Sequence, residues 1–522
     1  MLKRAARAGL LPGLVVTVVL IGAFVAPGRT SQLGPFSLAA ACYGTYPSCP
    51  APTVTSVSPN QGPIAGGTTV TVTGTGFGNI PTTVKFGATP GTSVTVISDT
   101  QLTVVSPAGT AGPVDVTVTT ASGTSATSVN DRFTYTAFSC DFQWYDKAST
   151  GFVQDNIHVI NTSSVSANVF VSVPGAATVS ATLAAGATTY LTFPQGTIGG
   201  PVVVNSDQTV ISSQRVQYNQ SFNEVWCETP GQASMTSYFN WYDKASDGFN
   251  NDNVHLLNPG TTTSNVTVSL TGVSGVTPVT VNVAAGAGTY VNFPQGTIGG
   301  PIKVVVNSGP AVLASQRVQY YGTFNEVWAQ PATLAATTTL LNWYDLASTG
   351  FVQDNVHLLN PQLATANVTV TMGSASVAAT VLAGGETYVK FPAGTIGGPV
   401  TVTSSVAILA SQRVQYNQSF NEEWAQTAAQ ALTVSRFTWF DKASTGFSNV
   451  NVHLLNPGST TATVTVVLGS TTLSATVAAG AETYVTFPFG TIGGPVVVTS
   501  NVPILAAERT QYFQTFNEIS SS

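Results

Sequence analysis

The sequence predicts an all-β protein, a tandem array of β-sandwich domains. Three observations support this fold class. β-branched residues are abundant and no long stretch has helical periodicity, which favours strands. Short alternating runs are separated by Gly, Pro and Asn, as in antiparallel sandwiches. A segment of about 97 residues is written four times, which indicates one structural unit used repeatedly.

The predicted segments follow from these patterns and from composition. They are a signal peptide or N-terminal anchor (1–41), a Cys-bounded linker (42–50), a first sandwich (51–136), and repeats 1 to 4 (137–229, 235–330, 337–427 and 433–522). At the N-terminus, basic residues precede the apolar run Leu10–Val25, which is 16 residues long. A membrane span needs about 20 residues, so export through a cleaved signal is predicted, with Ala39–Ala41 as a cleavage site. An uncleaved anchor is the alternative.

The composition is typical of an exported β protein. Only 7% of the residues are charged, against about 25% in ordinary soluble proteins. A surface of Thr, Ser and Asn lacks the clustered Lys and Arg that nucleic acids require. The formal charge of −6 becomes −10 if the four basic residues of segment 1–41 are removed, since 12 basic residues then face 22 acidic ones. We therefore expect no nucleic-acid partner, and membrane contact only through an uncleaved N-terminal segment.

Four cysteines in an exported chain predict two disulfides. Cys42 and Cys49 would close a small loop. Cys140 and Cys227 bracket repeat 1, at positions where the other repeats have small residues. A Cys140–Cys227 bridge would close a loop of 88 residues and contribute about 4 kcal/mol in the chain-entropy model. No CxxC pair occurs, so a cysteine metal site is not expected.

The first sandwich has a recognisable sequence. It opens with PTVTSVSPNQGPIAGGTTVTVTGTGF and later contains GPVDVTVTTASG. This stretch of about 85 residues resembles the IPT/TIG family of immunoglobulin-like domains. The resemblance implies an immunoglobulin-like fold and a role as a spacer or binding module in a bacterial surface protein. The repeats, with segments such as VHLLNPGSTTATVTVVLG and PILAAERTQYF, are similar to repeats of uncharacterised bacterial cell-surface proteins, which implies a location but no activity.

Each repeat contains an Asp, a His, an Arg and a Glu at matched positions. These are Asp146, His158, Arg215 and Glu224; Asp243, His255, Arg317 and Glu326; Asp345, His357, Arg413 and Glu422; and Asp441, His453, Arg509 and Glu518. They could ligate a metal or perform acid–base chemistry. We favour a buried structural network, in which Arg and Glu, nine residues apart, form a hairpin ion pair. A further carboxylate, Asp155 in repeat 1, becomes Val450 in repeat 4. No catalytic residue, metal or cofactor is therefore predicted, and no enzyme.

Two sets of aromatic residues invite a binding or packing role. Alternation in the first strand predicts outward, ligand-facing rings that could stack on sugars at Tyr145, Tyr242, Tyr344 and Phe440. Packing within a two-sided sandwich is the alternative. Trp226, Trp328 and Trp424 end repeats 1 to 3, whereas Ser520 ends repeat 4. This predicts that the three Trp side chains pack at junctions with a following repeat and stiffen a row of five domains. The repeated Gly-Thr-Ile-Gly-Gly-Pro is interpreted as a turn.

These features favour an exported cell-surface protein with a structural and adhesive role. It would be a non-catalytic stalk that makes weak, multiplied contacts with cell-envelope or extracellular glycans or with surface proteins. Linking such sites can raise avidity by about 10²–10⁴. The alternative is a carbohydrate-binding array that assists glycan-degrading enzymes. A third reading, a metal-dependent hydrolase using the four histidines, would require bound metal.

Overall fold

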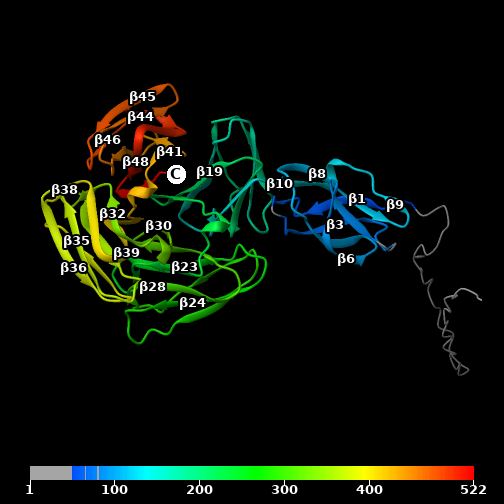
Figure 1. The fold of residues 1–522 in the computed structure, drawn as a ribbon, viewed down its shortest axis with the longest axis horizontal. Coiled ribbons are helices and arrows are strands. Elements are labelled where there is room, and N and C mark those ends of the chain that lie inside the picture. Colours follow the sequence, from blue (N-terminus) through cyan, green and yellow to red (C-terminus); the bar gives the residue numbers. More distant parts are fainter. Residues whose placement is uncertain (1–49, 65, 79–81, 522) are drawn as a thin grey trace, which may run out of the picture. The chain divides into compact units, whose positions relative to one another are not determined.

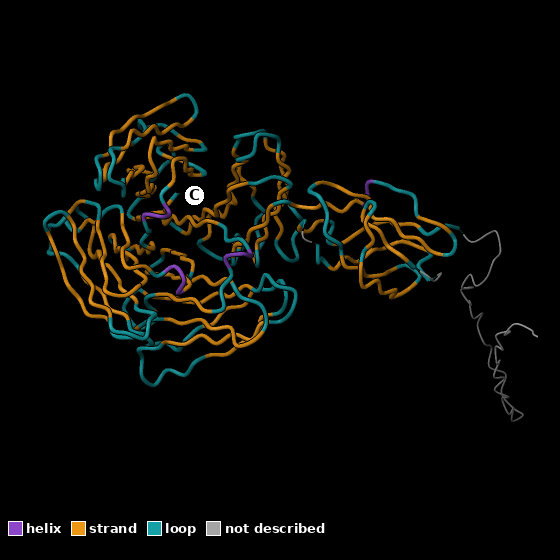
Figure 2. Tube along the Cα trace, viewed as in Figure 1, coloured by secondary structure: helices purple, strands orange, loops and turns teal. Residues whose placement is uncertain are grey.

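The computed structural model describes residues 50–64, 66–78 and 82–521. The predicted signal segment, Cys42 and Cys49 lie outside these residues. Strands dominate, and the helical elements in the described ranges are four short 3-10 turns: η1 (Val129–Asp131), η2 (Pro230–Gln232), η3 (Ala332–Leu334) and η4 (Ala428–Gln430) (Figure 2). Within the same ranges, no helix has the length and apolarity needed to cross a membrane. The predicted all-β array of sandwich domains is confirmed.

The first sandwich consists of two sheets packed face to face. Its strands are β1 (Thr53–Ser58), β2 (Gln61–Pro63), β3 (Thr69–Thr75), β4 (Thr83–Phe86), β5 (Thr89–Pro90), β6 (Thr92–Ser98), β7 (Gln101–Val105), β8 (Gly112–Thr120), β9 (Gly123–Thr124) and β10 (Arg132–Thr136). The sheet orders are β1-β3-β7-β6 and β2-β10-β8-β4-β5, with β9 on β8. Alternate residues such as Val70 and Val72 point into the core, where Phe133 contacts Phe86 edge-to-face.

Repeat 1 is a sandwich of two four-stranded sheets. Its strands are β11 (Phe138–Phe142), β12 (Tyr145–Asp146), β13 (Phe152–Asn161), β14 (Ala167–Ser172), β15 (Val179–Leu183), β16 (Thr188–Leu191), β17 (Ile198–Gly199), β18 (Val202–Ser206), β19 (Val210–Tyr218) and β20 (Ser221–Trp226). The sheet orders are β11-β18-β14-β15 and β16-β13-β19-β20, and β12 pairs with β17. Cys140 and Cys227 form a disulfide across the repeat, with their Cα atoms 5.6 Å apart.

The other repeats keep this arrangement. Repeat 2 has β21 (Thr236–Phe239), β22 (Tyr242–Asp243), β23 (Phe249–Leu257), β24 (Ser264–Leu270), β25 (Val279–Val283), β26 (Gly288–Val291), β27 (Ile298–Gly299), β28 (Ile302–Ser308), β29 (Leu313–Tyr320), β30 (Thr323–Trp328) and β31 (Gln330–Pro331). Repeat 3 has β32 (Ala336–Leu341), β33 (Tyr344–Asp345), β34 (Phe351–Leu359), β35 (Ala366–Met372), β36 (Ala375–Val381), β37 (Glu386–Val389), β38 (Ile396–Gly397), β39 (Val400–Tyr416) and β40 (Ser419–Trp424). Repeat 4 has β41 (Leu432–Phe437), β42 (Phe440–Asp441), β43 (Phe447–Leu455), β44 (Ala462–Leu468), β45 (Thr471–Val477), β46 (Glu482–Val485), β47 (Ile492–Gly493), β48 (Val496–Tyr512) and β49 (Thr515–Ser520).

The central histidine strand of each repeat is buried on both faces. In β23 the side chains of Val254 and Leu256 lie in the repeat's own core. His255 and Leu257 point the other way and are also buried. His255 meets there the Trp144 ring of repeat 1, with the ring centroids 6.0 Å apart. A strand with two covered faces means that a second layer lies outside the sandwich, and that layer comes from another repeat.

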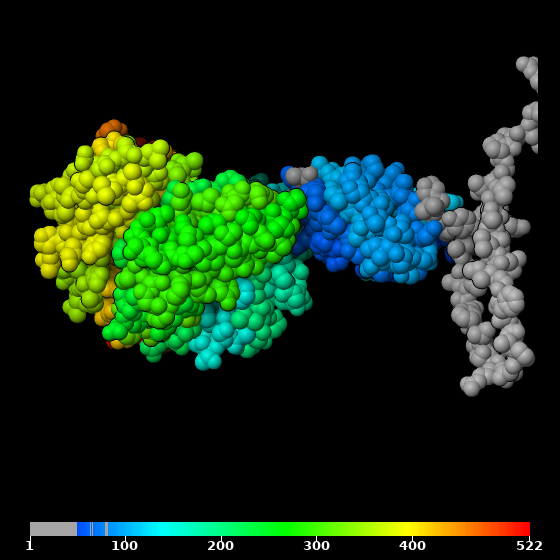
Figure 3. Space-filling view, turned by 90° about the horizontal axis from the view of Figure 1, so that it is seen from below, coloured from blue at the N-terminus to red at the C-terminus, as the bar shows by residue number. Residues whose placement is uncertain are grey.

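The repeats form a closed ring, and the predicted row is wrong for this part of the chain. Repeat 4 packs on repeat 1, where Trp226 Nε1 donates to Ser520 O (2.6 Å) and Thr438 Oγ1 donates to Glu224 Oε1 (2.8 Å). Phe222 of repeat 1 belongs to the buried core cluster of repeat 4. In Figure 1 the repeats follow one another around a common centre. In Figure 3 the green surface of repeat 2 borders the yellow surface of repeat 3.

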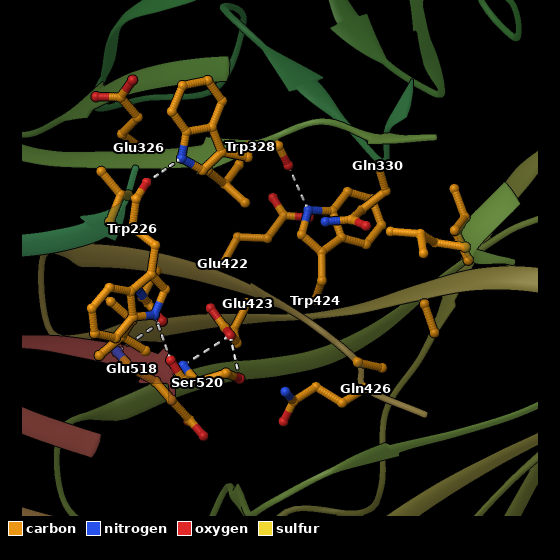
Figure 4. Close-up of a pocket in the computed structure, with 18 of the residues that line it drawn as sticks. Trp226, Glu326, Trp328, Gln330, Glu422, Glu423, Trp424, Gln426, Glu518 and Ser520 are labelled. Atoms are coloured by element: carbon orange, nitrogen blue, oxygen red, sulfur yellow. Dashed lines mark hydrogen bonds between the residues drawn. The ribbon is translucent and has the colours of Figure 1, made fainter. Parts of the chain in front are cut away.

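The last strands of the repeats meet at the ring centre, which we call the hub. Strands β20, β30, β40 and β49 contact one another there in cyclic order. Trp328 Nε1 donates to Trp226 O (2.7 Å), and Trp424 Nε1 donates to Trp328 O (2.8 Å) (Figure 4). The Trp side chains therefore lie at junctions between repeats.

Repeat 4 also has a neighbouring repeat, although it lacks the Trp. Ser520 Oγ donates to Glu423 Oε1 of repeat 3 (2.6 Å). The equivalents of Glu423 are Val225 in repeat 1 and Val327 in repeat 2. The interpretation that Trp is absent where no repeat follows is thus wrong. The junction between repeats 3 and 4 replaces the indole by a serine–carboxylate contact.

Candidate functional site

Neighbouring repeats meet at four junctions, and a groove runs along three of them. On one side lies the first Trp of a repeat, and on the other the His of the next repeat. The ring centroids are 6.0 Å apart for Trp144–His255, 6.2 Å for Trp241–His357, 5.5 Å for Trp343–His453 and 5.3 Å for Trp439–His158. We name the junctions 1/2, 2/3, 3/4 and 4/1, and the last three carry the junction grooves. The four histidines thus lie at matched positions.

A half-exposed tyrosine lies beside every groove histidine. The antiparallel register pairs His158 with Tyr190, and the two rings are 5.5 Å apart and tilted by 31°. The strand that carries the tyrosine is the outer strand of its sheet, so one face of the ring remains in solvent. The tyrosines are 49–52% exposed at Tyr190, Tyr290, Tyr388 and Tyr484. Each groove therefore offers an accessible aromatic face next to a half-buried indole.

The Gly-Thr-Ile-Gly-Gly-Pro turn forms the edge of the groove. Its isoleucine, for example Ile492 in groove 4/1, is 48% exposed. A Cβ on the last glycine of the motif would collide with the carbonyl oxygen of the residue just before the Trp, as at Gly494 with Thr438 O. Glycine lets the turn lie directly on the Trp strand. The motif therefore positions an apolar side chain at the groove edge.

Amide side chains line the rest of the groove. In groove 4/1, which has a volume of about 380 Å³, Gln154, Asn156 and Gln217 surround the aromatic rings. Groove 2/3 also measures about 380 Å³ and groove 3/4 about 200 Å³, with equivalent linings. The Asp441 carboxylate accepts hydrogen bonds from the backbone N–H groups of Ala443 and Ser444. That carboxylate is committed to holding the turn.

The Arg and Glu of each predicted network form an ion pair below the groove floor. Arg215 Nε lies 3.1 Å from Glu224 Oε2, and the guanidinium lies 4.7 Å from the Phe222 ring centroid. The Glu of the ion pair also accepts a hydrogen bond from the preceding repeat. The donor is Thr438 at this junction and Asn240 at the 2/3 junction. The distances in the other three repeats are 3.1–3.3 Å. The Arg–Glu pairs therefore hold strands and neighbouring repeats together.

The histidines are separate from these ion pairs and are uncharged. Desolvation, reinforced by the nearby arginine, holds the pKa of each imidazole well below its ordinary value. In grooves 2/3 and 3/4 the Nδ1 atoms of His357 and His453 lie 2.6 Å from carboxylates of Glu386 and Glu482. Burial raises the pKa of both carboxyl groups to about 8. Each pair thus joins an imidazole whose protonation burial disfavours to a carboxyl group whose ionisation burial disfavours.

The rings predicted to face a ligand are buried, so that prediction is wrong. Tyr145, Tyr242, Tyr344 and Phe440 are all 0% exposed. Tyr145 OH donates to Asp155 O (2.8 Å) and accepts from Phe193 N–H (3.0 Å). Tyr145 lies in the two-residue strand β12, which pairs with β17 apart from the two four-stranded sheets, and its ring is part of the core of repeat 1. The exposed tyrosines lie instead on the strand that pairs with the histidine strand. These tyrosines recur in all four repeats, and that recurrence is the sequence feature that could have identified them.

Comparisons with known proteins support the first sandwich. Residues 52–135 match the IPT/TIG domain family, which confirms that predicted domain. A stretch of 67 residues is 45% identical to Fibrocystin-L of Mus musculus, covering 13% of this chain and 2% of that protein.

Among solved structures, a gamma-CGTase from Alkalophilic bacillus clarkii is 20% identical, with 34% of this chain and 24% of that chain covered and a TM-score of 0.16. SGBP-B from a complex xyloglucan utilization locus in Bacteroides uniformis is 11% identical, with 90% and 100% covered and a TM-score of 0.15. This chain thus spans a small part of Fibrocystin-L and about a quarter of the gamma-CGTase.

Proposed function

We propose that this chain is an exported, non-catalytic glycan-binding protein that presents four equivalent saccharide sites. The observation that carries the proposal is the half-exposed tyrosine beside a neutral histidine and a neighbouring indole, repeated at every junction of the ring. Evenly repeated sites are suited to weak, multiplied contacts.

The groove chemistry matches a pyranose ring. A pyranose has an apolar face of C–H bonds and a rim of hydroxyl groups. Aromatic faces and an aliphatic edge bind C–H surfaces by dispersion and by removal of apolar area from water. Asn and Gln amides both donate to and accept from hydroxyls. The groove therefore combines a stacking platform with a polar rim.

The charges favour a neutral saccharide. The guanidinium at the groove floor is paired with a buried Glu, the Asp carboxylate is bonded to backbone N–H groups, and the histidine is uncharged. An anionic or cationic ligand would find no free counter-charge on these groups. We therefore expect hexose- or pentose-based glycans without carboxylate or amino substituents.

The remaining domains suit display outside the cell. A disulfide within repeat 1 is typical of an oxidising compartment. The IPT/TIG domain at residues 52–135 would act as a spacer on the N-terminal side of the ring. In this proposal the repeats do not form the predicted stalk. Only this domain and the segment before it would act as a stalk.

Glycan binding tests the proposal directly. The full chain would be titrated with a panel of neutral oligosaccharides and with purified cell wall. Replacing Tyr190, Tyr290, Tyr388 and Tyr484 by Ala should weaken binding at least tenfold, since an aromatic pair contributes about 0.5–1.5 kcal/mol beyond its burial.

The matched control is Tyr321→Asn, which removes a tyrosine of similar exposure that lies outside the groove linings and restores the residue found in repeats 1 and 3. Binding that survives the fourfold change, or that is lost equally with Tyr321→Asn, would contradict the site. A folded chain that binds no glycan and no cell wall would leave a structural role.

A further inference from the structure

The hub contains a cavity that the junction grooves do not include. Its volume is about 180 Å³, and residues of all four repeats line it. Three indoles, those of Trp226, Trp328 and Trp424, stand around it (Figure 4). Each indole N–H is used in a hydrogen bond to a neighbouring repeat, which fixes the ring orientation. The cavity is therefore walled by pre-oriented aromatic rings.

The cavity is acidic. The carboxylates of Glu224, Glu326, Glu422 and Glu518 are each neutralised by an arginine. Two further lining carboxylates, those of Glu228 and Glu423, have no basic partner among the described residues. No Lys or Arg occurs among the described residues that line the space. Glu423 is only partly covered and lies between the indoles in Figure 4. The hub thus holds two acidic groups without a basic partner, and a bound cation would favour their ionised form.

Unpartnered polar atoms lie in the same wall. Asn223 is 1% exposed, and within the described residues neither its Nδ2 nor its Oδ1 has a hydrogen-bond partner. The Oγ1 atom of Thr339, 3% exposed, is likewise without a partner there. Both residues line the cavity. Buried polar groups are normally satisfied, so these atoms indicate that something polar occupies the space.

We propose that the hub binds a small organic cation with a quaternary or tertiary ammonium head. Aromatic faces attract such cations through the ring quadrupole, most strongly for Trp. Glu423 and Glu228 supply the counter-charge, and Asn223 and Thr339 supply partners for a short polar arm. A metal ion fits less well, because Ca²⁺ and Mg²⁺ need several oxygen ligands. The described residues contain no group of three or more His, Cys, Asp or Glu side chains that could hold one.

The site would link ligand binding to ring closure. The three indoles come from repeats 1, 2 and 3, and Glu423 bonds to Ser520 of repeat 4. A ligand that needs all of them binds only the closed ring and stabilises it by mass action. Burial raises the pKa of Glu423 to about 8. A bound cation would convert this carboxyl group to its ionised form, so binding at pH 7 should release a proton and should tighten as the pH rises through 8.

Choline and its neutral isostere 3,3-dimethylbutan-1-ol provide the test. Both would be titrated into the full chain by calorimetry at pH 7 and pH 8.5. We expect one choline to bind per chain, at least tenfold more tightly than the alcohol. We also expect choline to raise the Tm of the chain and the alcohol to leave the Tm unchanged. Equal binding of the two molecules, or no choline binding, would overturn the proposal and leave a water-filled cavity.

Two variants locate the site. Glu423→Gln keeps an acceptor for Ser520 Oγ–H and removes the charge, so choline should bind at least tenfold more weakly while the fold is retained. The fourfold tyrosine variant of the junction grooves should bind choline normally. Loss of choline binding in the tyrosine variant, or a stoichiometry of four, would place the cation in the grooves and would contradict a hub site. Failure of glycan binding would leave this result untouched.

Discussion

The junction between repeats 4 and 1 differs from the other three because no linker crosses it. Repeats 1 and 2, for example, are joined by residues 230–234, which include the turn η2. The closing junction nevertheless has the same Trp–His contact and the same side-chain donation into the Arg–Glu pair. The donation comes from a substituted residue, Thr438, where repeats 1 to 3 have Gln143, Asn240 and Asn342. Ring closure is therefore a specific interface, not a chance contact of chain ends.

The substitutions occur in compensating pairs. In repeat 1 Gln214 Nε2 donates to Trp144 O (2.8 Å) and to Asp155 Oδ1 (2.7 Å). Repeat 4 has Glu508 in place of the Gln and Val450 in place of the Asp. Desolvation raises the pKa of Glu508 well above its ordinary value. A neutral carboxyl group can donate one hydrogen bond, as the amide does, so the exchange keeps one buried acid in this Asp–Gln pair of positions.

The largest effect is expected from opening the closing junction. Trp226→Ala removes an indole that packs on the core of repeat 4 and donates to Ser520 O. We expect a loss of about 3–5 kcal/mol in the free energy of unfolding and a larger radius of gyration in X-ray scattering. Trp328→Ala should lose similar stability with a smaller expansion, since a linker still joins its neighbours. An unchanged radius for Trp226→Ala would contradict closure.

The disulfide allows the closing junction to be compared with the others, because it lies in repeat 1, which contacts repeat 4 across that junction. Replacing Cys140 and Cys227 by Ser should lower the stability of repeat 1 by about 4 kcal/mol in the chain-entropy model. Denaturant unfolding followed by hydrogen exchange would show whether repeat 1 becomes the first to open. Equal loss of protection in repeat 3 would indicate that the ring unfolds as one unit.

The serine–carboxylate contact tests the compensation at the hub. Glu423→Val leaves Ser520 Oγ and N without their acceptor and should destabilise the ring by about 1–3 kcal/mol. Ser520→Ala should remove little more once Glu423 is absent. A double-mutant cycle by chemical denaturation measures this coupling, and additive effects would show that the two residues are independent.

The smallest effect concerns pH. A carboxyl whose pKa is raised on folding binds more protons in the native state, so its effect on stability worsens as the pH rises above the unfolded value near 4.5. Glu508→Gln should therefore be neutral at pH 4 and more stable by about 1 kcal/mol at pH 7. Gln214→Glu, which faces Asp155, should do the opposite. Identical pH profiles for wild type and Glu508→Gln would show that Glu508 is not protonated in the fold.

Much of this architecture could be predicted from the spacing of residues along the chain. The period of Trp144 and His158 defined the repeats, and the small residues opposite Cys140 and Cys227 indicated adjacent strand ends. The positions of Tyr145 and its equivalents could not be inferred, because alternation does not say which face is covered. The closing contact has no local signal either. Among the exceptional residues, Ser520 of repeat 4 with Glu423 of repeat 3 points only to the junction between those two repeats.

Closure has a consequence for how such a gene can change. Each repeat uses one surface to contact the next repeat and a different surface to contact the previous one. Such head-to-tail contacts close into a ring only when the rotation from one repeat to the next is a whole fraction of 360°. Linear arrays gain and lose copies freely, because terminal units need only one neighbour. Here a recombination event that added a fifth copy or deleted one would leave both unlike surfaces of the array unpaired. The geometry of the ring therefore fixes the copy number at four, and we expect the repeats to change by substitution of residues and not by gain or loss of a copy.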